Sequence, residues 1–196
     1  MRKPSPRVAV VTAALCAAAL FTGCSERTSE PAVNRAAERF SKVREVLLAA
    51  PRVTVTAAVS ADYGERVFEF RLQYSGTQEG GELELLSPQM LAGVTARVSN
   101  NAATIRYDGA ELDTGSLGDG LSPAGIVPRL IVEWQSGFAD SLVIESGALI
   151  MQSALTADAR QVTHFDNATG SPVRTEVICS GRVVLTVLYE SFAIDP

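Results

Sequence analysis

The chain has 196 residues, and its 17 Lys and Arg against 22 Asp and Glu give a formal net charge of −5. Three of the basic residues lie before residue 24, so the remaining segment has 14 basic against 22 acidic residues and a net charge of −8. Such an acidic segment argues against nucleic-acid binding, which requires Lys and Arg at the phosphates, and against a basic patch that docks on anionic lipids. The roughly 173 residues after position 23 suffice for one domain with a sizeable core.

Residues 1–23 have the pattern of an export signal. A positive start precedes the apolar run Val8–Phe21, which is shorter than the about 20 residues of a membrane-spanning helix. The run ends at Phe21-Thr22-Gly23-Cys24, which resembles the lipobox of a bacterial lipoprotein signal, with Phe21 where that family usually has Leu. The resemblance implies that Cys24 becomes the first mature residue. Its acyl chains, such as palmitate, would anchor the protein on the extracytoplasmic face of the cell membrane.

A short polar linker and a helix are predicted next. Residues 24–30 form the linker, whose typical reach of about 15 Å keeps the folded domain close to the bilayer. Residues 31–49 are predicted as an amphipathic helix, because apolar residues recur at intervals of three and four. The apolar stripe is Val33, Ala36, Ala37, Phe40, Val43 and Leu47. Pro51 is expected to end this helix.

After Pro51 the period of the apolar residues changes to two, which is typical of half-buried strands. Strands are predicted at 53–59, 67–74, 82–86, 94–98 and 103–107, with short turns that favour an antiparallel meander. The glycine-rich residues 109–122 are predicted as a loop. A short helix is predicted from Ser122-Pro123-Ala124 to Gln135. Further strands are predicted at 142–146, 148–155, 160–166, 172–179 and 182–194.

This order of elements predicts an α+β fold. About nine or ten strands form an incomplete antiparallel β-barrel, a half-barrel, with an N-terminal and an inserted helix covering its open side. The C-terminal third contains His164-Phe165-Asp166, Thr169-Gly170-Ser171-Pro172 and Tyr189-Glu190-Ser191-Phe192. These motifs resemble the aromatic-Asp turn, the Thr-Gly-x-Pro strand start and the aromatic-x-x-Phe strand end of the outer-membrane lipoprotein carrier superfamily, the LolA and LolB proteins and their relatives. The resemblance covers residues 31–196 in layout and about 160–194 in motifs.

The resemblance implies an apolar cavity that binds a lipid, an acyl chain or a lipidated ligand at the cell envelope. Each buried CH₂ of such a ligand contributes about 0.8 kcal/mol. The side chains expected to face the cavity are Phe68, Phe70, Leu72, Tyr74, Leu83, Leu85, Ile105, Tyr107, Ile131 and Trp134. The alternative is a non-enzymatic envelope interaction or sensor module in which these side chains fill a core, since core and cavity-lining residues have the same periodicity.

No catalytic residue, metal ligand or cofactor is predicted. Asp113-Thr114-Gly115-Ser116 spells the aspartic-protease nucleus, but that chemistry needs two such carboxylates, so the segment is interpreted as a turn. His164 is the only histidine, and no Gly-x-Ser-x-Gly segment supplies a serine nucleophile. Cys179 is the only cysteine after Cys24, which leaves it without an intramolecular disulfide partner once Cys24 is acylated.

Overall fold

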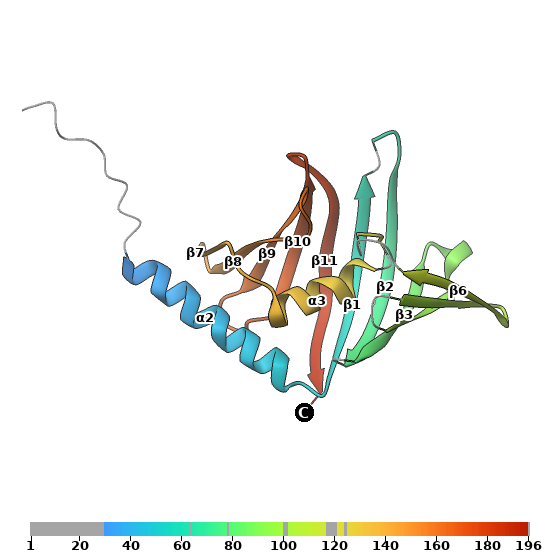
Figure 1. The fold of residues 1–196 in the computed structure, drawn as a ribbon, viewed down its shortest axis with the longest axis horizontal. Coiled ribbons are helices and arrows are strands. Elements are labelled where there is room, and N and C mark those ends of the chain that lie inside the picture. The colour runs from blue at the N-terminus through green and yellow to red at the C-terminus, as the bar shows by residue number, and fades with distance from the viewer. Residues whose placement is uncertain are drawn as a thin grey trace, which may run out of the picture. The chain divides into compact units, whose positions relative to one another are not determined.

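The computed structural model describes residues 30–62, 64–77, 79–99, 102–116, 121–123 and 125–195, so the predicted signal, Cys24 and residues 25–29 of the linker lie outside it. The described helices are α2 (Glu30–Ala49) and α3 (Ile126–Ser136), with a 3-10 turn η1 (Gln89–Leu91). The described strands are β1 (Arg52–Asp62), β2 (Val67–Thr77), β3 (Gly80–Ser87), β4 (Thr95–Ser99), β5 (Ala102–Tyr107), β6 (Ala110–Ser116), β7 (Ser141–Glu145), β8 (Ala148–Ala154), β9 (Ala159–Asp166), β10 (Pro172–Cys179) and β11 (Arg182–Asp195). Figure 1 shows their arrangement.

Helix α2 buries the central part of the stripe that its sequence indicates. Ala36, Phe40, Val43 and Leu47 are buried at intervals of four, three and four residues. Val33, at the start of the stripe, is 46% exposed. The helix ends at Ala49, because a proline at position 51 disfavours a helical backbone at the residue before it.

The eleven strands form one antiparallel sheet in the order β6-β5-β4-β3-β2-β1-β11-β10-β9-β8-β7. Two meanders, β1 to β6 and β7 to β11, are joined where the first strand pairs with the last, with Val53 opposite Ile194. Strands β6 and β7 are the two edges, so the sheet is an open half-barrel. The predicted α+β half-barrel is confirmed, with eleven strands rather than nine or ten.

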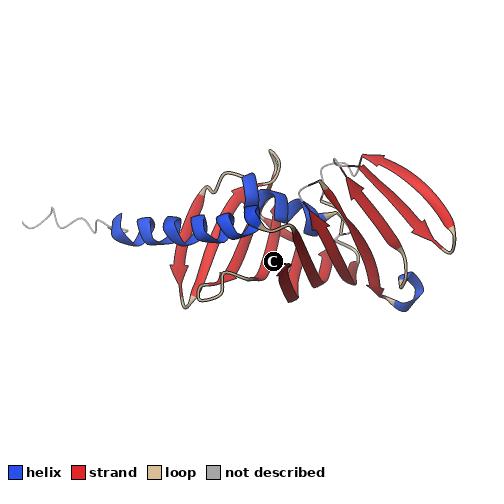
Figure 2. Cartoon of the chain, turned by 90° about the horizontal axis from the view of Figure 1, so that it is seen from below, coloured by secondary structure: helices blue, strands red, loops and turns tan. Residues whose placement is uncertain are grey.

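Both helices lie on the same face of the sheet, here called the inner face, as the view from below shows (Figure 2). Strand β1 explains the choice of face, because its side chains alternate strictly between buried and half-buried positions from Val53 to Ala61. In the figures, α2 extends across the side of β7 to β10, and α3 crosses near β11 and β1. The strands β4 to β6 extend beyond both helices.

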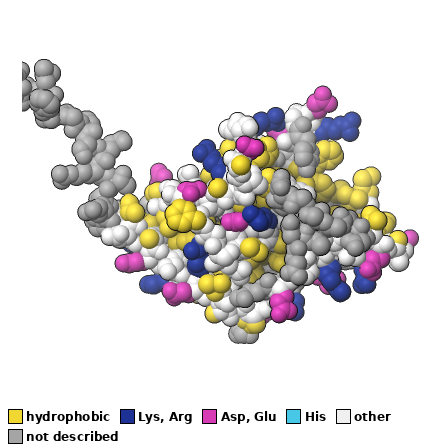
Figure 3. All heavy atoms as spheres, in the orientation of Figure 1, with side chains coloured by type: hydrophobic (Ala, Val, Ile, Leu, Met, Phe, Trp, Pro, Cys, Tyr) yellow, Lys and Arg dark blue, Asp and Glu magenta, His cyan; other side chains and the backbone are white. Residues whose placement is uncertain are grey.

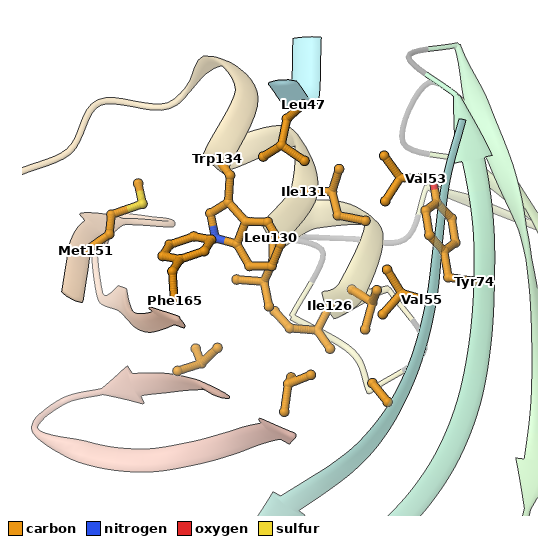
Figure 4. Packing of buried hydrophobic residues seen from close by; sticks show 14 of the residues in the cluster. Leu47, Val53, Val55, Tyr74, Ile126, Leu130, Ile131, Trp134, Met151 and Phe165 are labelled. Carbon is orange, nitrogen blue, oxygen red and sulfur yellow. The ribbon is translucent and has the colours of Figure 1, made fainter. Parts of the chain in front are cut away.

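The space between α3 and the sheet is filled by large side chains (Figure 4). Trp134 is fully buried and meets Phe165 of β9 edge-on, with ring centroids 5.2 Å apart. Ile126 and Leu130 are also fully buried on the same helix. Trp134 Nε1 donates to Gln161 Oε1 and to Thr163 Oγ1, each at 3.3 Å, so the indole is both packed and hydrogen-bonded.

Two predicted boundaries differ from the structure. The segment predicted as a loop contains strand β6, in which Leu112 pairs with Ile105 and Asp113 with Thr104, so Asp113-Thr114 belongs to a strand and not to a turn. The glycines concealed this strand, and one of them, Gly115, lies beside a register shift in the β5–β6 pair. Helix α3 begins at Ile126, not near Ser122, whose Oγ accepts a hydrogen bond from the Gly125 N–H.

Candidate functional site

Six of the ten side chains expected to line a cavity belong to the core. Leu72, Tyr74, Leu83, Ile131 and Trp134 are buried, and Leu85 is partly buried against the same cluster. These six side chains belong to, or pack against, the hydrophobic core cluster that also contains Ile126 and Leu130 of α3.

The other four residues lie on the inner face where neither helix covers it. Leu72 pairs with Leu85 and Tyr74 with Leu83, so the even-numbered residues of β2 share the inner face with them. Phe68 is 41% exposed and Tyr107 52% exposed. Phe68, Phe70, Ile105, Tyr107 and Leu112 are here called the open face. Hydrophobic side chains gather on this side of the molecule in the space-filling view (Figure 3).

A groove of about 280 Å³ lies elsewhere, between α2 and the ends of strands β9 to β11. It is here called the α2 groove. Helix α2 contributes Arg39, Lys42, Val43, Val46 and Leu47 to its lining. The sheet contributes the apolar side chains Phe165, Pro172, Phe192 and Ile194, and the turn before β10 contributes Thr169, Gly170 and Ser171.

The wall opposite α2 is a turn that is tightly fixed to the helix. Arg39 Nε donates to the Asn167 carbonyl and its NH2 to the Ala168 carbonyl, both at 2.8 Å. Gly170 has a φ of +80°, and a Cβ at this position would lie 3.0 Å from Val43 Cγ2. Glycine is therefore required both by the backbone conformation and by the close approach of the turn to α2.

Asp166 closes the same turn from within. Its Oδ1 accepts hydrogen bonds from the backbone N–H groups of Ala168 and Thr169 and from the Thr169 hydroxyl. The Thr169 donors, helped by the N–H of Ala168 and the charge of Arg39, hold the pKa of Asp166 below its ordinary value of 3.8. The carboxylate is thus ionised at neutral pH and organises the groove wall.

The floor of the groove is continuous with the core. Phe165 contacts both Phe40 of α2 and Trp134 of α3, with ring centroids 6.0 and 5.2 Å apart. Phe192, on the other side, lies 6.4 Å from Trp134 by the same measure. A ligand in the groove would rest on side chains that also hold α3.

Two cations lie at the rim of the groove, and they differ in whether they are hydrogen-bonded. Arg39 is engaged with the backbone carbonyls of the turn. Lys42 is exposed and makes no hydrogen bond or ion pair within the part of the chain that the structure describes. The arrangement combines an apolar floor with one available positive charge, which suits an amphiphile better than a polar substrate.

Two further properties of the described residues bear on metal binding and on membrane insertion. Among the described residues, no three of His, Cys, Asp and Glu are grouped so that they could hold a metal ion. Neither described helix is both long and apolar enough to cross a bilayer. His164 is half-buried in β9, and Cys179 is a free thiol at the end of β10 that packs partly against the core.

Reasoning from the sequence did not place the α2 groove. Its lining residues come from α2, β9, the turn before β10 and β11, and no single periodicity connects them. One signal was present, because the Thr169-Gly170-Ser171-Pro172 motif and Phe192 both line the groove. The motif and Phe192 lie close together because the strand order places β9, β10 and β11 side by side under α2.

Comparison with known proteins shows the fold. No family model matches the sequence, and no curated protein matches it. The structure of the CwlD amidase from Clostridioides difficile in complex with the GerS lipoprotein matches with a TM-score of 0.51 and 17% identity, over 81% of this chain and 95% of the matched chain. An uncharacterized conserved protein from Thermus thermophilus matches with a TM-score of 0.50 and 12% identity, over 82% and 88% of the two chains.

A LolA superfamily protein from Nitrosomonas europaea also matches, with a TM-score of 0.45 and 9% identity over 82% of this chain and 94% of that one. Identities this low concern the fold alone. At that level this chain shares its fold, an open antiparallel half-barrel with two helices, with the two structures that match at TM-scores of 0.50 and 0.51.

Proposed function

We propose that this LolA-like chain is a membrane-anchored lipoprotein of the cell envelope that binds an acyl chain, as part of a lipid or lipidated ligand, in the α2 groove. The observation that carries the proposal is the groove itself, about 280 Å³ with an apolar floor of Val43, Phe165, Phe192 and Ile194. Because Leu72, Ile131 and Trp134, which were expected to line a cavity, are buried in the hydrophobic cluster, we place the acyl site in the α2 groove instead.

The size of the groove agrees with one acyl chain. Pockets for small ligands have volumes of roughly 300 to 1,000 Å³, and this groove lies at the lower end of that range. Burial of eight methylene groups would contribute about 6 kcal/mol before the costs of binding. A free energy of this size would retain the ligand during gentle extraction only if its acyl chain occupies most of the groove.

The predicted anchor supports the same function. An acylated Cys24 and a linker of about 15 Å reach would hold the groove near the surface that supplies its ligand. The described domain starts with α2, and α2 itself forms one wall of the groove.

The test is mass spectrometry of the intact protein, purified from a membrane extract in a mild detergent. We expect co-purified lipid with the unaltered chain and its loss in Val46→Gln, which places an amide in the groove at a position that is 53% exposed and tolerant of the change. Val33→Gln is the matched control, because Val33 is 46% exposed on the same helix and does not line the groove. A protein that remains empty even with excess lipid would contradict the proposal.

A second candidate function is an interaction module of the envelope. The filled core under α3, with Trp134 fully buried, favours it. The CwlD–GerS structure is a complex of two proteins, which is consistent with a partner-binding use of the fold. An empty protein that nonetheless captures a defined envelope protein would favour this candidate.

A further inference from the structure

We infer that the α2 groove selects a free fatty acid, a single-chain amphiphile whose carboxylate is held at the rim by Lys42. The inference rests on the proposed function and names the ligand class of the same site. It draws on three features of the groove: its length, its available charge and the hydroxyl on its opposite wall.

The length of the groove fits one chain. Its lining residues on α2 run from Arg39 to Leu47, which is about 12 Å along the helix axis at 1.5 Å per residue. One leaflet of a bilayer has a hydrocarbon depth of about 15 Å, which one acyl tail spans. A groove of about 280 Å³ has little room for a second or third tail, whose apolar surface would stay outside it, so the groove favours a ligand with one tail.

Charge complementarity identifies the head group. The segment after residue 23 has a net charge of −8, so a site without a local cation would repel an anion. Several other cations of the domain form ion pairs, among them Arg71 with Glu190, Arg129 with Glu133 and Arg182 with Asp62, and exposed cations such as Arg160 do not line the groove. Lys42 lies at the groove without such a pair among the described residues, although Glu38 and Glu45 occupy neighbouring turns of α2.

The opposite wall offers a second donor. Ser171 lines the groove, and its hydroxyl makes no hydrogen bond within the described part of the chain, whereas its N–H donates to Thr169 Oγ1. The Asp166 carboxylate forms no ion pair with Lys42 among the described residues, and its Oδ1 accepts three hydrogen bonds within the turn. A carboxylate between Lys42 and Ser171 would accept from both sides, and charge-assisted hydrogen bonds of this kind are stronger than neutral ones.

The chain contains its own reporter. Trp134 is the only tryptophan, and its ring lies 5.2 Å from Phe165 and 6.4 Å from Phe192, two residues of the groove floor. Occupation of the groove should therefore change the fluorescence of Trp134. The unaltered chain can be titrated with dodecanoate, dodecyl maltoside and dodecyltrimethylammonium, which share a twelve-carbon tail and differ in head-group charge, each below the concentration at which it forms micelles.

We expect dodecanoate to bind more tightly than dodecyl maltoside, and dodecyltrimethylammonium to bind most weakly. Lys42→Met keeps an apolar stem and should weaken dodecanoate binding roughly three- to fivefold, the size of a partly exposed ion pair, and leave the maltoside unchanged. Arg160→Met is the matched control, because Arg160 is an exposed cation at the start of β9 that does not line the groove. Added salt should reduce the preference for dodecanoate.

Different results would overturn the choice of a fatty acid and the binding of an acyl chain in the groove. Equal binding of dodecanoate and the maltoside, unaffected by Lys42→Met, would overturn the choice of a fatty acid and leave acyl binding intact. An equal loss in Lys42→Met and Arg160→Met would also overturn it, because the effect would then be that of net charge. Failure of all three amphiphiles to bind would overturn the proposed function together with the inference.

Discussion

A buried polar network fixes the side chain that connects α3 to the sheet. Trp134 Nε1 donates to Gln161 and Thr163, Gln161 Nε2 donates to Ser153 Oγ at 2.8 Å, and the hydroxyls of Thr163 and Thr175 are 2.9 Å apart. Ser153, Gln161, Thr163 and Thr175 are all fully buried. Because polar groups are costly to bury without partners, such a network specifies one position for the indole.

Replacement of Trp134 by Phe should therefore destabilise the domain. The variant removes the donor that Gln161 Oε1 and Thr163 Oγ1 share, whereas Gln161 Oε1 still accepts from the Thr163 hydroxyl at 3.1 Å, so the lost hydrogen bond costs about 0.5–1.5 kcal/mol before any cavity is counted. The free energy of unfolding in urea, followed by circular dichroism, measures the effect. Phe138→Leu is the control, because Phe138 is 81% exposed and should change stability little. If Trp134→Phe is as stable as Phe138→Leu, the hydrogen bonds of the indole do not contribute to the free energy of unfolding.

Asp166 predicts a pH dependence of the groove wall. Its pKa is below 3.8 in the folded state because of the Thr169 and Ala168 donors, so its contribution to stability is fully present above that value. The contribution is lost as the pH falls through the folded-state pKa. Asp166→Asn should be less stable than the unaltered chain at neutral pH, and the difference should shrink toward pH 2.

Thermal unfolding of both proteins at a series of pH values between neutral and acid tests this expectation. The same difference in melting temperature at every pH would mean that the hydrogen bonds, and not the charge, of Asp166 support the turn. A difference that grows toward acid would contradict the assigned direction of the pKa change.

At the scale of elements, one arginine connects the two helices. Arg44 of α2 donates from Nε to the Trp134 carbonyl at 2.9 Å and from NH2 to the Gly137 carbonyl, at the C-terminal end of α3. Its guanidinium also lies over the Phe40 ring, 4.9 Å from the centroid. Gln135 adds a hydrogen bond in the opposite direction, to the Leu47 carbonyl at 3.0 Å. A cation at this end satisfies carbonyls that a helix leaves without partners.

Arg44→Met should loosen the last turn of α3 with little effect on the strands. We expect faster amide hydrogen exchange in residues 132–137 and unchanged exchange in β1 and β11, which form the centre of the sheet. Arg35→Met, an exposed cation earlier on the same helix, is the matched control. Equal exchange in the two variants would mean that Arg44 does not hold α3.

The elements differ in how far the sequence predicts them. Strand β1 is evident because every second residue from Val53 to Ala61 is apolar and buried on one face. Strand β6 is not evident from the sequence, because Gly115 and its neighbours have the composition of a loop. This strand is stabilised by its pairing with β5. Leu72 and Phe68 lie on the same face of β2, as their alternation indicates, but periodicity does not tell which of the expected cavity residues α3 covers, and their role in a cavity stays a prediction.

The whole molecule is predicted to be held at the membrane by the acyl anchor at Cys24. We expect the mature protein from bacterial membranes to begin at Cys24 and to carry acyl chains there, detected as mass added to the N-terminal peptide. Cys24→Ser should leave the domain folded and abolish its association with the membrane fraction, because no basic patch is predicted to replace the anchor. An unmodified Cys24 in the mature protein would contradict the lipoprotein assignment, whatever the groove binds.

In the proposed function an acyl chain occupies the α2 groove and not the open face or the space under α3. Methyl NMR of the domain with a fatty acid that carries a spin label near its methyl end distinguishes the three places. We predict that the label broadens the methyl signals of Val43, Val46 and Ile194, which line the groove, and spares Ile105 and Leu112 of the open face. Broadening confined to Ile105 and Leu112, or to Ile131 under α3, would contradict the assignment of the groove as the acyl-binding site.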